Sequence, residues 1–161
     1  MQQNRNDPVT IPFFTRLVAT GLFAGYSPIV PGTAGSLVGV GIYAIPGMET
    51  PVVLSLATLA VLFLGANVSG RMEKKLGEDP QIIVIDEIIG MWISLLFLPK
   101  RLLVVLIAFI LFRIYDTFKP PPARQLERVG HGWGVMLDDV AAGVYANLTV
   151  RLILVLFSGI M

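Results

Sequence analysis

The sequence predicts an all-α membrane protein, a polytopic helical bundle with a polar site at its cytoplasmic end. Of the 161 residues, 55% are hydrophobic and only 14% are charged, whereas about 25% of the residues in an ordinary soluble domain are charged. Residues 17–48 and 51–70 contain no charge at all, and about 20 apolar residues suffice to cross a bilayer. The third observation is that acidic residues recur at the predicted ends of the apolar helices.

Composition also excludes several classes of function. A net charge of +1 gives no reason to expect nucleic acid, which requires a clustered basic face. The absence of cysteine excludes a disulfide framework, a thiolate nucleophile and a thiolate metal site. Residues 2–12 are polar and do not resemble a cleaved signal peptide. We expect a polar lead-in over 1–12 and a single helical domain over 13–161, with no obligate protein partner evident.

In the first half of the chain, glycine and proline divide the apolar sequence into helices. We expect a first helix over 13–24, a loop over 27–36 and a second helix from about residue 33 to 44. The first helix is short, so the sequence leaves open whether it crosses the bilayer or lies in the interface. Residues 51–66 are almost purely aliphatic and predict the clearest membrane-spanning helix.

A charged loop over 71–81 leads into the central helix, which is predicted over 82–98 and ends at Pro99. After a tight turn, residues 102–115 predict the next helix. Lys119 precedes three successive prolines, which remove backbone donors and restrict the residue before them, so this helix cannot continue.

A polar, glycine-rich loop over 124–134 and a last helix over 135–157 complete the chain. The loop holds the only histidine, His131. The last helix is predicted to carry Asp138 and Asp139 in its first turn.

Helices joined by short loops alternate in direction, which brings the charged helix ends to one side of the bundle. The turn at the start of the 33–44 helix lies on the same side as these charged ends if that helix also crosses the membrane. This side carries seven basic residues and the other side two, and a basic excess marks the cytoplasmic face. The asymmetry remains when Arg113 and Lys119 are left out. The seven are Arg71, Lys74, Lys75, Arg113, Lys119, Arg124 and Arg128, and the two are Lys100 and Arg101.

Five carboxylates are predicted to lie together at this end. Bundle cores commonly hold metal sites built from acids on facing helices. With no cysteine and one histidine, an all-oxygen site favours Mg²⁺ or another hard cation over zinc. The sequence also allows that two of the five only cap helices or pair with Arg113. The five are Asp86, Glu87, Asp116, Asp138 and Asp139.

Neighbouring helix residues diverge by about 100°, so the two acids of each adjacent pair cannot point the same way. Asp86 shares its helix face with Gly90, and Asp139 shares its face with three small residues, Ala142, Gly143 and Ala146. Small residues permit close helix approach. We therefore expect Asp86 and Asp139 to point inward as ligands.

The turn Pro31–Ser36 opens a helix whose free N–H groups suit a phosphate. It is not a Walker loop, because no lysine follows its glycines, and a simple helix-starting turn is the commoner explanation. Arg113, Lys119 and His131 add positive or proton-carrying groups, although the glycines around His131 can equally just shape a turn. A metal, an anion cradle and basic residues together indicate phosphate-ester chemistry at a membrane surface.

Four motifs, in order and spanning nearly the whole chain, resemble the phosphatidylglycerophosphatase A family. The resemblance implies a helical, bacterial, membrane-bound and Mg²⁺-dependent enzyme that removes the terminal phosphate from phosphatidylglycerophosphate to give phosphatidylglycerol. The polar lead-in and the sparse loop over 71–81 depart from the family pattern. The motifs are Pro31–Ser36, Asp86–Trp92, Arg113–Pro120, and His131–Gly132 followed by Asp138–Gly143.

We therefore expect a lipid phosphatase in the bacterial inner membrane, with its phospholipid substrate as partner. A water on the metal, deprotonated by a carboxylate, would attack the phosphorus in line, with His131 a candidate acid for the departing oxygen; the sequence also allows an aspartyl-phosphate. Asp116 would be a ligand or would hold Arg113. The expected metal ligands are Asp86, Glu87, Asp138 and Asp139, the phosphate-binding residues Gly32, Thr33, Gly35, Ser36, Arg113 and Lys119, and the catalytic residues Asp86, Asp116, Asp139 and His131.

Two other functions fit parts of the sequence less well. A small cation transporter or channel would explain the buried carboxylates but leaves the glycine turn, Arg113 and Lys119 without a task. A phosphatidyltransferase is disfavoured because the Asp-Gly…Ala-Arg pattern of that family is absent.

Overall fold

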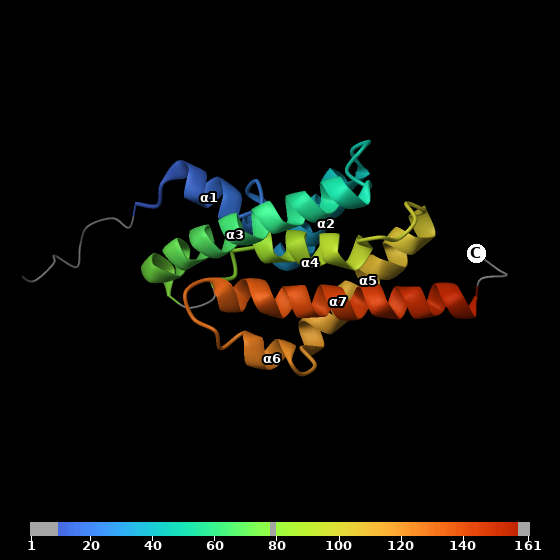
Figure 1. The fold of residues 1–161 in the computed structure, drawn as a ribbon. Helices are drawn as coiled ribbons and strands as arrows, with labels where there is room; N and C mark the ends of the chain where they lie inside the picture. The colour runs from blue at the N-terminus through green and yellow to red at the C-terminus, as the bar shows by residue number, and fades with distance from the viewer. Residues whose placement is uncertain (1–9, 78–79, 158–161) are drawn as a thin grey trace, which may run out of the picture.

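Seven α-helices and one 3₁₀-helix, with no strand, make up the part of the chain that the computed structural model describes, residues 10–77 and 80–157 (Figure 1). The predicted all-α class is therefore confirmed. Most of the expected lead-in, residues 1–9, lies outside the described residues. The elements are α1 Phe13–Ala19, η1 Ala24–Tyr26, α2 Pro31–Ala44, α3 Pro51–Leu76, α4 Ile85–Leu95, α5 Leu102–Phe118, α6 Ala123–Leu126 and α7 Trp133–Leu156.

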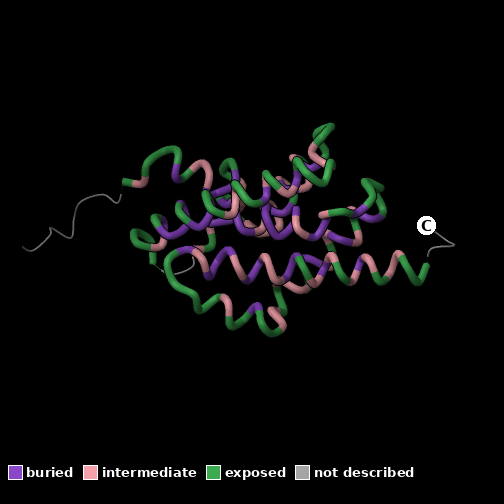
Figure 2. The backbone as a smooth tube through the Cα atoms, in the orientation of Figure 1, coloured by how far each residue is buried: buried purple, intermediate pink, exposed green. Residues whose placement is uncertain are grey.

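The short helix α4 is the centre of the fold. It packs against α2, α3, α5 and α7, and all of its residues except Glu87 and Ile93 are buried. Figure 2 shows the buried backbone concentrated in this central helix and on the sides of its neighbours that face it. Two acidic residues in the first turn of α4 are thus carried into the middle of the bundle end.

Glycines let the neighbouring helices approach α4 at backbone distance. A Cβ added at Gly143 of α7 would lie 2.5 Å from the carbonyl oxygen of Gly90, and one added at Gly39 of α2 would lie 3.2 Å from Cα of Ile88. The indole Nε1 of Trp92 donates to the Gly39 carbonyl at 2.9 Å. The close approach expected from the small residues of α4 and α7 is confirmed.

The carboxyl end of α4 is satisfied by side chains of α7. Asn147 Nδ2 donates to the carbonyls of Ile93, Ser94 and Leu96, and Arg151 Nη2 donates to Leu96. Backbone groups within an apolar surround need such partners, because water is not there to pair with them. The central helix ends at Leu95, three residues before the predicted end. Arg151, which binds the Leu96 carbonyl, lies at the same end of the bundle as the carboxyl end of α4.

Two helices of the first half differ from their predicted bounds. The first helix ends at Ala19 instead of 24, because the backbone turns left-handed at Leu22 and Phe23. The second helix starts at Pro31, whose fixed φ and missing N–H suit the first helical position.

The charged segment after the aliphatic helix is mostly helical and not the predicted loop. Helix α3 continues to Leu76 and stops at Gly77, which has φ +98°. In the second half, the short helix α6 interrupts the expected loop over 124–134, and α7 begins at Trp133 after left-handed Gly132. Asp138 and Asp139 consequently lie in the second turn of α7.

Helices α3 and α7 are long and apolar enough to cross a membrane. The end of the bundle opposite the acidic cluster is closed by the two turns between α2 and α3 and between α4 and α5. There the Lys100 ammonium lies 3.1 Å from the Glu49 carboxylate and donates to the Ala44 carbonyl. Figure 1 shows these turns on the right and the carboxyl end of α3, α6 and the start of α7 on the left.

Candidate active site

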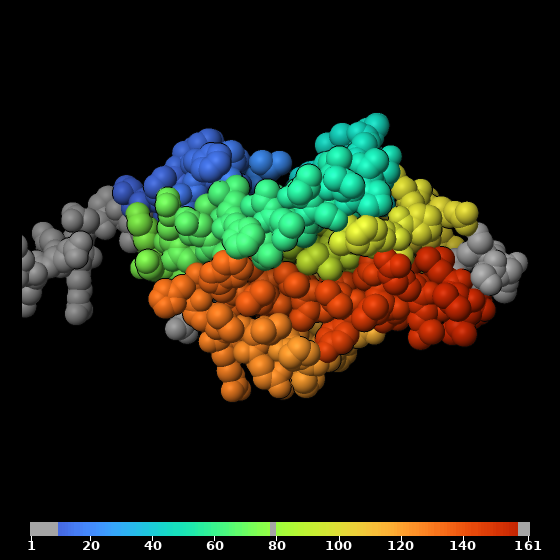
Figure 3. Space-filling view, viewed as in Figure 1, coloured from blue at the N-terminus to red at the C-terminus, as the bar shows by residue number. Residues whose placement is uncertain are grey.

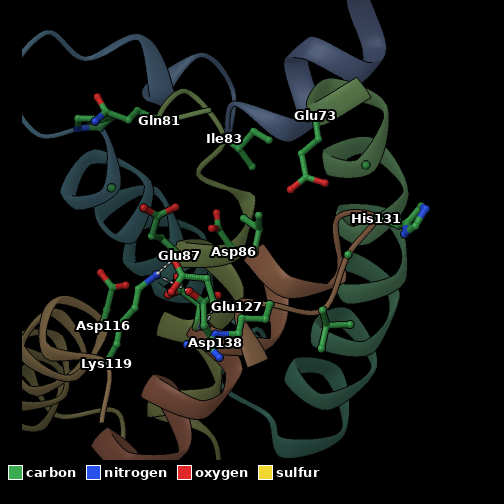
Figure 4. A pocket seen from close by; sticks show the side chains of 18 of the residues that line it. Glu73, Gln81, Ile83, Asp86, Glu87, Asp116, Lys119, Glu127, His131 and Asp138 are labelled. Carbon is green, nitrogen blue, oxygen red and sulfur yellow. Dashed lines mark hydrogen bonds and ion pairs between the residues drawn. The ribbon is translucent and has the colours of Figure 1, made fainter. Parts of the chain in front are cut away.

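A cavity of about 690 Å³ opens at the end of the bundle where the charged helix ends meet (Figure 4). The start of α2, the end of α3, the start of α4, the end of α5 and the start of α7 all contribute to it. Alternation of helices predicted this convergence, and the structure confirms it. The acidic and basic lining residues are Glu73, Lys74, Asp86, Glu87, Arg113, Asp116, Lys119, Glu127, Arg128, His131, Asp138 and Asp139.

Three carboxylates meet at the bottom of this cavity. One oxygen each of Asp86, Glu87 and Asp139 lies within 4.8 Å of the others. Asp86 Oδ1, Glu87 Oε2 and Asp139 Oδ2 are buried and have no hydrogen-bond partner among the described residues. Buried carboxylate oxygens without partners are costly unless a proton or a cation compensates them. We call these three residues the carboxylate triad.

The triad fits a hard divalent cation. Its donor atoms are all carboxylate oxygens, which Mg²⁺ and Ca²⁺ prefer, and one oxygen of each residue lies close to one of each of the other two. The triad exists because α4 and α7 touch through Gly90 and Gly143, one turn further from the bundle end than Asp86 and Asp139. The predicted inward direction of Asp86 and Asp139 agrees with this geometry.

Asp138 points to a different partner. Its Oδ2 lies 2.6 Å from the Lys119 ammonium, and its Oδ1 accepts the backbone N–H of Asp139 at 3.0 Å. Glu127 binds the same ammonium at 3.0 Å, as the dashed lines in Figure 4 mark. The structure thus places Asp138 outside the triad. Lys119, which was expected to bind phosphate, is ion-paired with two acids, Asp138 and Glu127.

The environment of Lys119 keeps its charge. Burial alone would lower the pKa of the ammonium, but the hydrogen bonds and negative charges of Asp138 and Glu127 raise that pKa above its ordinary value. Lys119 itself is in the left-handed conformation, with φ +43°, where α5 ends before the prolines. Its position is therefore set by the helix end and its charge by two acids.

Arg113 connects the glycine turn with the acids. Its Nη1 lies 2.9 Å from Asp116 Oδ2 and 3.4 Å from Ser36 Oγ. A Cβ added at Gly32 would collide with Glu87 Oε1 and lie 3.0 Å from Arg113 Nη2. A larger residue at position 32 would force the ends of Glu87 and Arg113 to shift, because the start of α2 lies directly against both side chains.

The rest of the glycine turn serves the packing of α2. Among its residues only Pro31 and Gly32 line the cavity. A Cβ at Gly35 would lie 2.7 Å from Cβ of Val84, and the buried Ser36 hydroxyl donates to the Gly32 carbonyl at 2.9 Å. Thr33 is half-buried and is not among the lining residues.

His131 lies at the rim of the cavity, with φ +68°. Figure 4 shows its side chain directed away from Asp86, Glu87 and Asp138. The structure does not bring its imidazole to the carboxylates, and its role as the acid for the departing oxygen stays a prediction.

Two lining acids were not anticipated from the sequence. Glu73 Oε2 accepts the backbone N–H of Gly132 at 2.8 Å, which fixes the start of α7 against α3. Glu127 shares Lys119 with Asp138. A prediction that the aliphatic helix continues through its charged end would have placed Glu73 at the cavity. No local sequence pattern points to Glu127.

The arrangement suits phosphate-ester chemistry. Glu87 of the triad and the Arg113 guanidinium both lie against Gly32, and a cation held by carboxylates and a guanidinium can both stabilise phosphoryl oxygens. The triad and Arg113 thus come from three helices, α4, α5 and α7, that meet at one cavity.

Comparisons with known proteins agree with this chemistry. The family model of phosphatidylglycerophosphatase A matches residues 17–154. The chain is 40% identical to phosphatidylglycerophosphatase A of Escherichia coli over 80% of this chain and 76% of that protein, and 35% identical to the Haemophilus influenzae protein of that name over 83% and 85%. It is also 40% identical, over 86% of this chain and 92% of the relative, to a Bacteroides thetaiotaomicron protein that carries the provisional name phosphatidylinositol-3-phosphatase. No solved structure matches the chain.

The pairing of Lys119 with Asp138 can be tested by a double-mutant cycle. Lys119→Met leaves the buried Asp138 without its counter-ion and should lower the free energy of unfolding by up to about 3 kcal/mol. Asp138→Asn in the same chain removes the orphaned charge and should recover most of the loss. Thermal or denaturant unfolding in detergent measures both. Destabilisation of the double variant equal to the sum of the effects of Lys119→Met and Asp138→Asn alone would show that the two residues are not coupled.

Proposed function

Because the chain belongs to the phosphatidylglycerophosphatase A family, and is therefore a phosphoric monoester hydrolase acting on a lipid, we propose that it hydrolyses the terminal phosphate of phosphatidylglycerophosphate with the help of Mg²⁺. The observation that carries the proposal is the carboxylate triad, in which each residue has one unpartnered buried oxygen and of which Glu87 lies beside Arg113 and the start of α2. The products would be phosphatidylglycerol and phosphate.

Asp86, Glu87 and Asp139 would hold the cation, which when bound neutralises charge on the phosphoryl oxygens. Arg113 would bind the same phosphate through the N–H groups that Asp116 and Ser36 leave free, since its planar fork matches phosphate oxygens. The ion pair with Asp116 at 2.9 Å holds that fork in place.

Proton transfer needs a carboxylate outside the triad. Asp116 lies on the cavity wall and is only paired with Arg113 among the ion pairs of the described residues. We assign it as the group that takes the proton from the attacking water. Asp138 and Glu127 are held by Lys119, so they fix the local charge and the position of α7.

The same geometry supports a location in the membrane. Helices α3 and α7 would span the bilayer, with α2 and α5 alongside, and the basic end would face the cytoplasm. The cavity would then open at the level of the lipid headgroups, where a phospholipid can present its phosphate without leaving the membrane.

Phosphate release from purified protein tests the activity. Phosphatidylglycerophosphate in detergent micelles should release phosphate in the presence of Mg²⁺, chelation should abolish the release, and re-added Mg²⁺ should restore it. Asp139→Asn should remove turnover, and Glu49→Gln, a carboxylate at the opposite end, should keep it. Full turnover in excess chelator would refute the role of the metal. Faster phosphate release from phosphatidylinositol 3-phosphate than from phosphatidylglycerophosphate would show that the former is the preferred substrate.

Accessibility of introduced cysteines tests the orientation, since the chain contains no native cysteine. In right-side-out vesicles an impermeant thiol reagent should label Met48→Cys in the turn between α2 and α3. It should spare Gln125→Cys in α6 until the membrane is permeabilised. Labelling of Gln125→Cys in intact vesicles would place the cavity outside.

A further inference from the structure

A second cavity, of about 420 Å³, adjoins the first on the outer side of the bundle. It lies between the charged end of α3 and the start of α7, and it shares Gly70, Lys74 and His131 with the first cavity. We call it the α3 groove. Its lining residues are Phe63, Ala66, Asn67, Gly70, Arg71, Lys74, His131 and Trp133.

The α3 groove carries positive charge that is not ion-paired with any acid among the described residues. Arg71 and Lys74 are exposed, and in the described part of the chain neither makes an ion pair or a side-chain hydrogen bond. The cations of the first cavity differ, because Arg113 and Lys119 are each held by acids. The groove therefore offers an anion two cations that are still free to bind it.

An apolar track leads into this charge along one face of α3. Leu56, Leu59 and Phe63 are 62%, 52% and 62% exposed, and Asn67 and Arg71 follow at helical spacing on the same face. The face thus changes from aliphatic to aromatic to cationic toward the bundle end.

Trp133, the first residue of α7, closes the groove at the polar end of the track. Its ring packs edge-on against Phe63 with the centroids 5.7 Å apart. Figure 3 shows α3 lying across this face beside the first part of α7. Aromatic side chains of this kind prefer the boundary between hydrocarbon and headgroups.

We propose that the α3 groove binds the diacylglycerol phosphodiester part of the lipid substrate, with the diester phosphate on Arg71 and Lys74 and an acyl chain along the apolar track. This proposal rests on the proposed function, in which the terminal phosphate occupies the first cavity. The substrate carries two phosphates, and the two adjoining cavities provide one set of cationic groups for each. His131 lies at their junction, where the glycerol between the phosphates would pass.

Quenching of Trp133 fluorescence tests the groove without using catalysis. The probe is phosphatidylglycerol brominated in its acyl chains, which has the diester phosphate but no monoester; brominated phosphatidylcholine is the comparison lipid. The signal of Trp133 is the difference between the wild type and Trp133→Phe. We expect about tenfold tighter apparent binding of the anionic lipid, and loss of this preference in Arg71→Gln/Lys74→Gln.

Lys75→Gln is the control for the Lys74→Gln part of the double variant, since it also removes one positive charge, from the neighbouring residue. The Lys75 side chain binds the Thr10 carbonyl outside the groove. This variant should keep the preference. Equal quenching by the two lipids in the wild type, or an unchanged preference in the double variant, would overturn the proposal.

Kinetics give a second readout. Arg71→Gln/Lys74→Gln should raise KM for phosphatidylglycerophosphate about tenfold with kcat nearly unchanged, because the lost contact is made equally in ground and transition states. A fall in kcat with unaltered KM would contradict a binding role. Absence of phosphate release by the wild type would contradict the proposed function. The quenching experiment would still show whether the α3 groove binds the anionic lipid.

Discussion

Three buried carboxylate oxygens without partners are the constraint on which the rest of the structure depends. Asp86, Glu87 and Asp139 face one another across the contact of α4 and α7, and one buried oxygen of each has no hydrogen-bond partner among the described residues. An arrangement of this kind is unfavourable unless a cation completes it. The Gly90–Gly143 contact, the short length of α4 and its capping by Asn147 all serve to hold these acids at the bundle end.

Charge at the cavity is divided between adjacent residues of one helix. Asp139 belongs to the triad, whereas Asp138, about 100° further round α7, binds Lys119 together with Glu127. Arg113 is held by Asp116 yet keeps Nη2 toward the start of α2. The acids thus fall into two groups, one that can receive a cation and one that fixes the basic side chains. Membership of the phosphatidylglycerophosphatase A family is consistent with this division, since both a bound cation and basic side chains can stabilise the charge of a phosphate.

The sequence predicted the all-α class, the convergence of charged helix ends and the inward direction of Asp86 and Asp139, because helical period and small residues are local signals. It did not predict the partner of Asp138, since Lys119 and Glu127 meet only through the folded segment between α5 and α7. The extension of α3 over residues 71–76 also departs from the predicted loop, because charged residues can continue a helix beyond its apolar part. The α3 groove depends on that extension.

Metal binding by matched variants tests the central claim most directly. Mn²⁺ bound per protein, counted by electron paramagnetic resonance of the free ion, distinguishes the two adjacent acids of α7. We predict that Asp139→Asn loses the bound ion while Asp138→Asn retains it, with Glu49→Gln equal to the wild type. Retention of the ion in Asp139→Asn together with its loss in Asp138→Asn would contradict the carboxylate triad as the metal site.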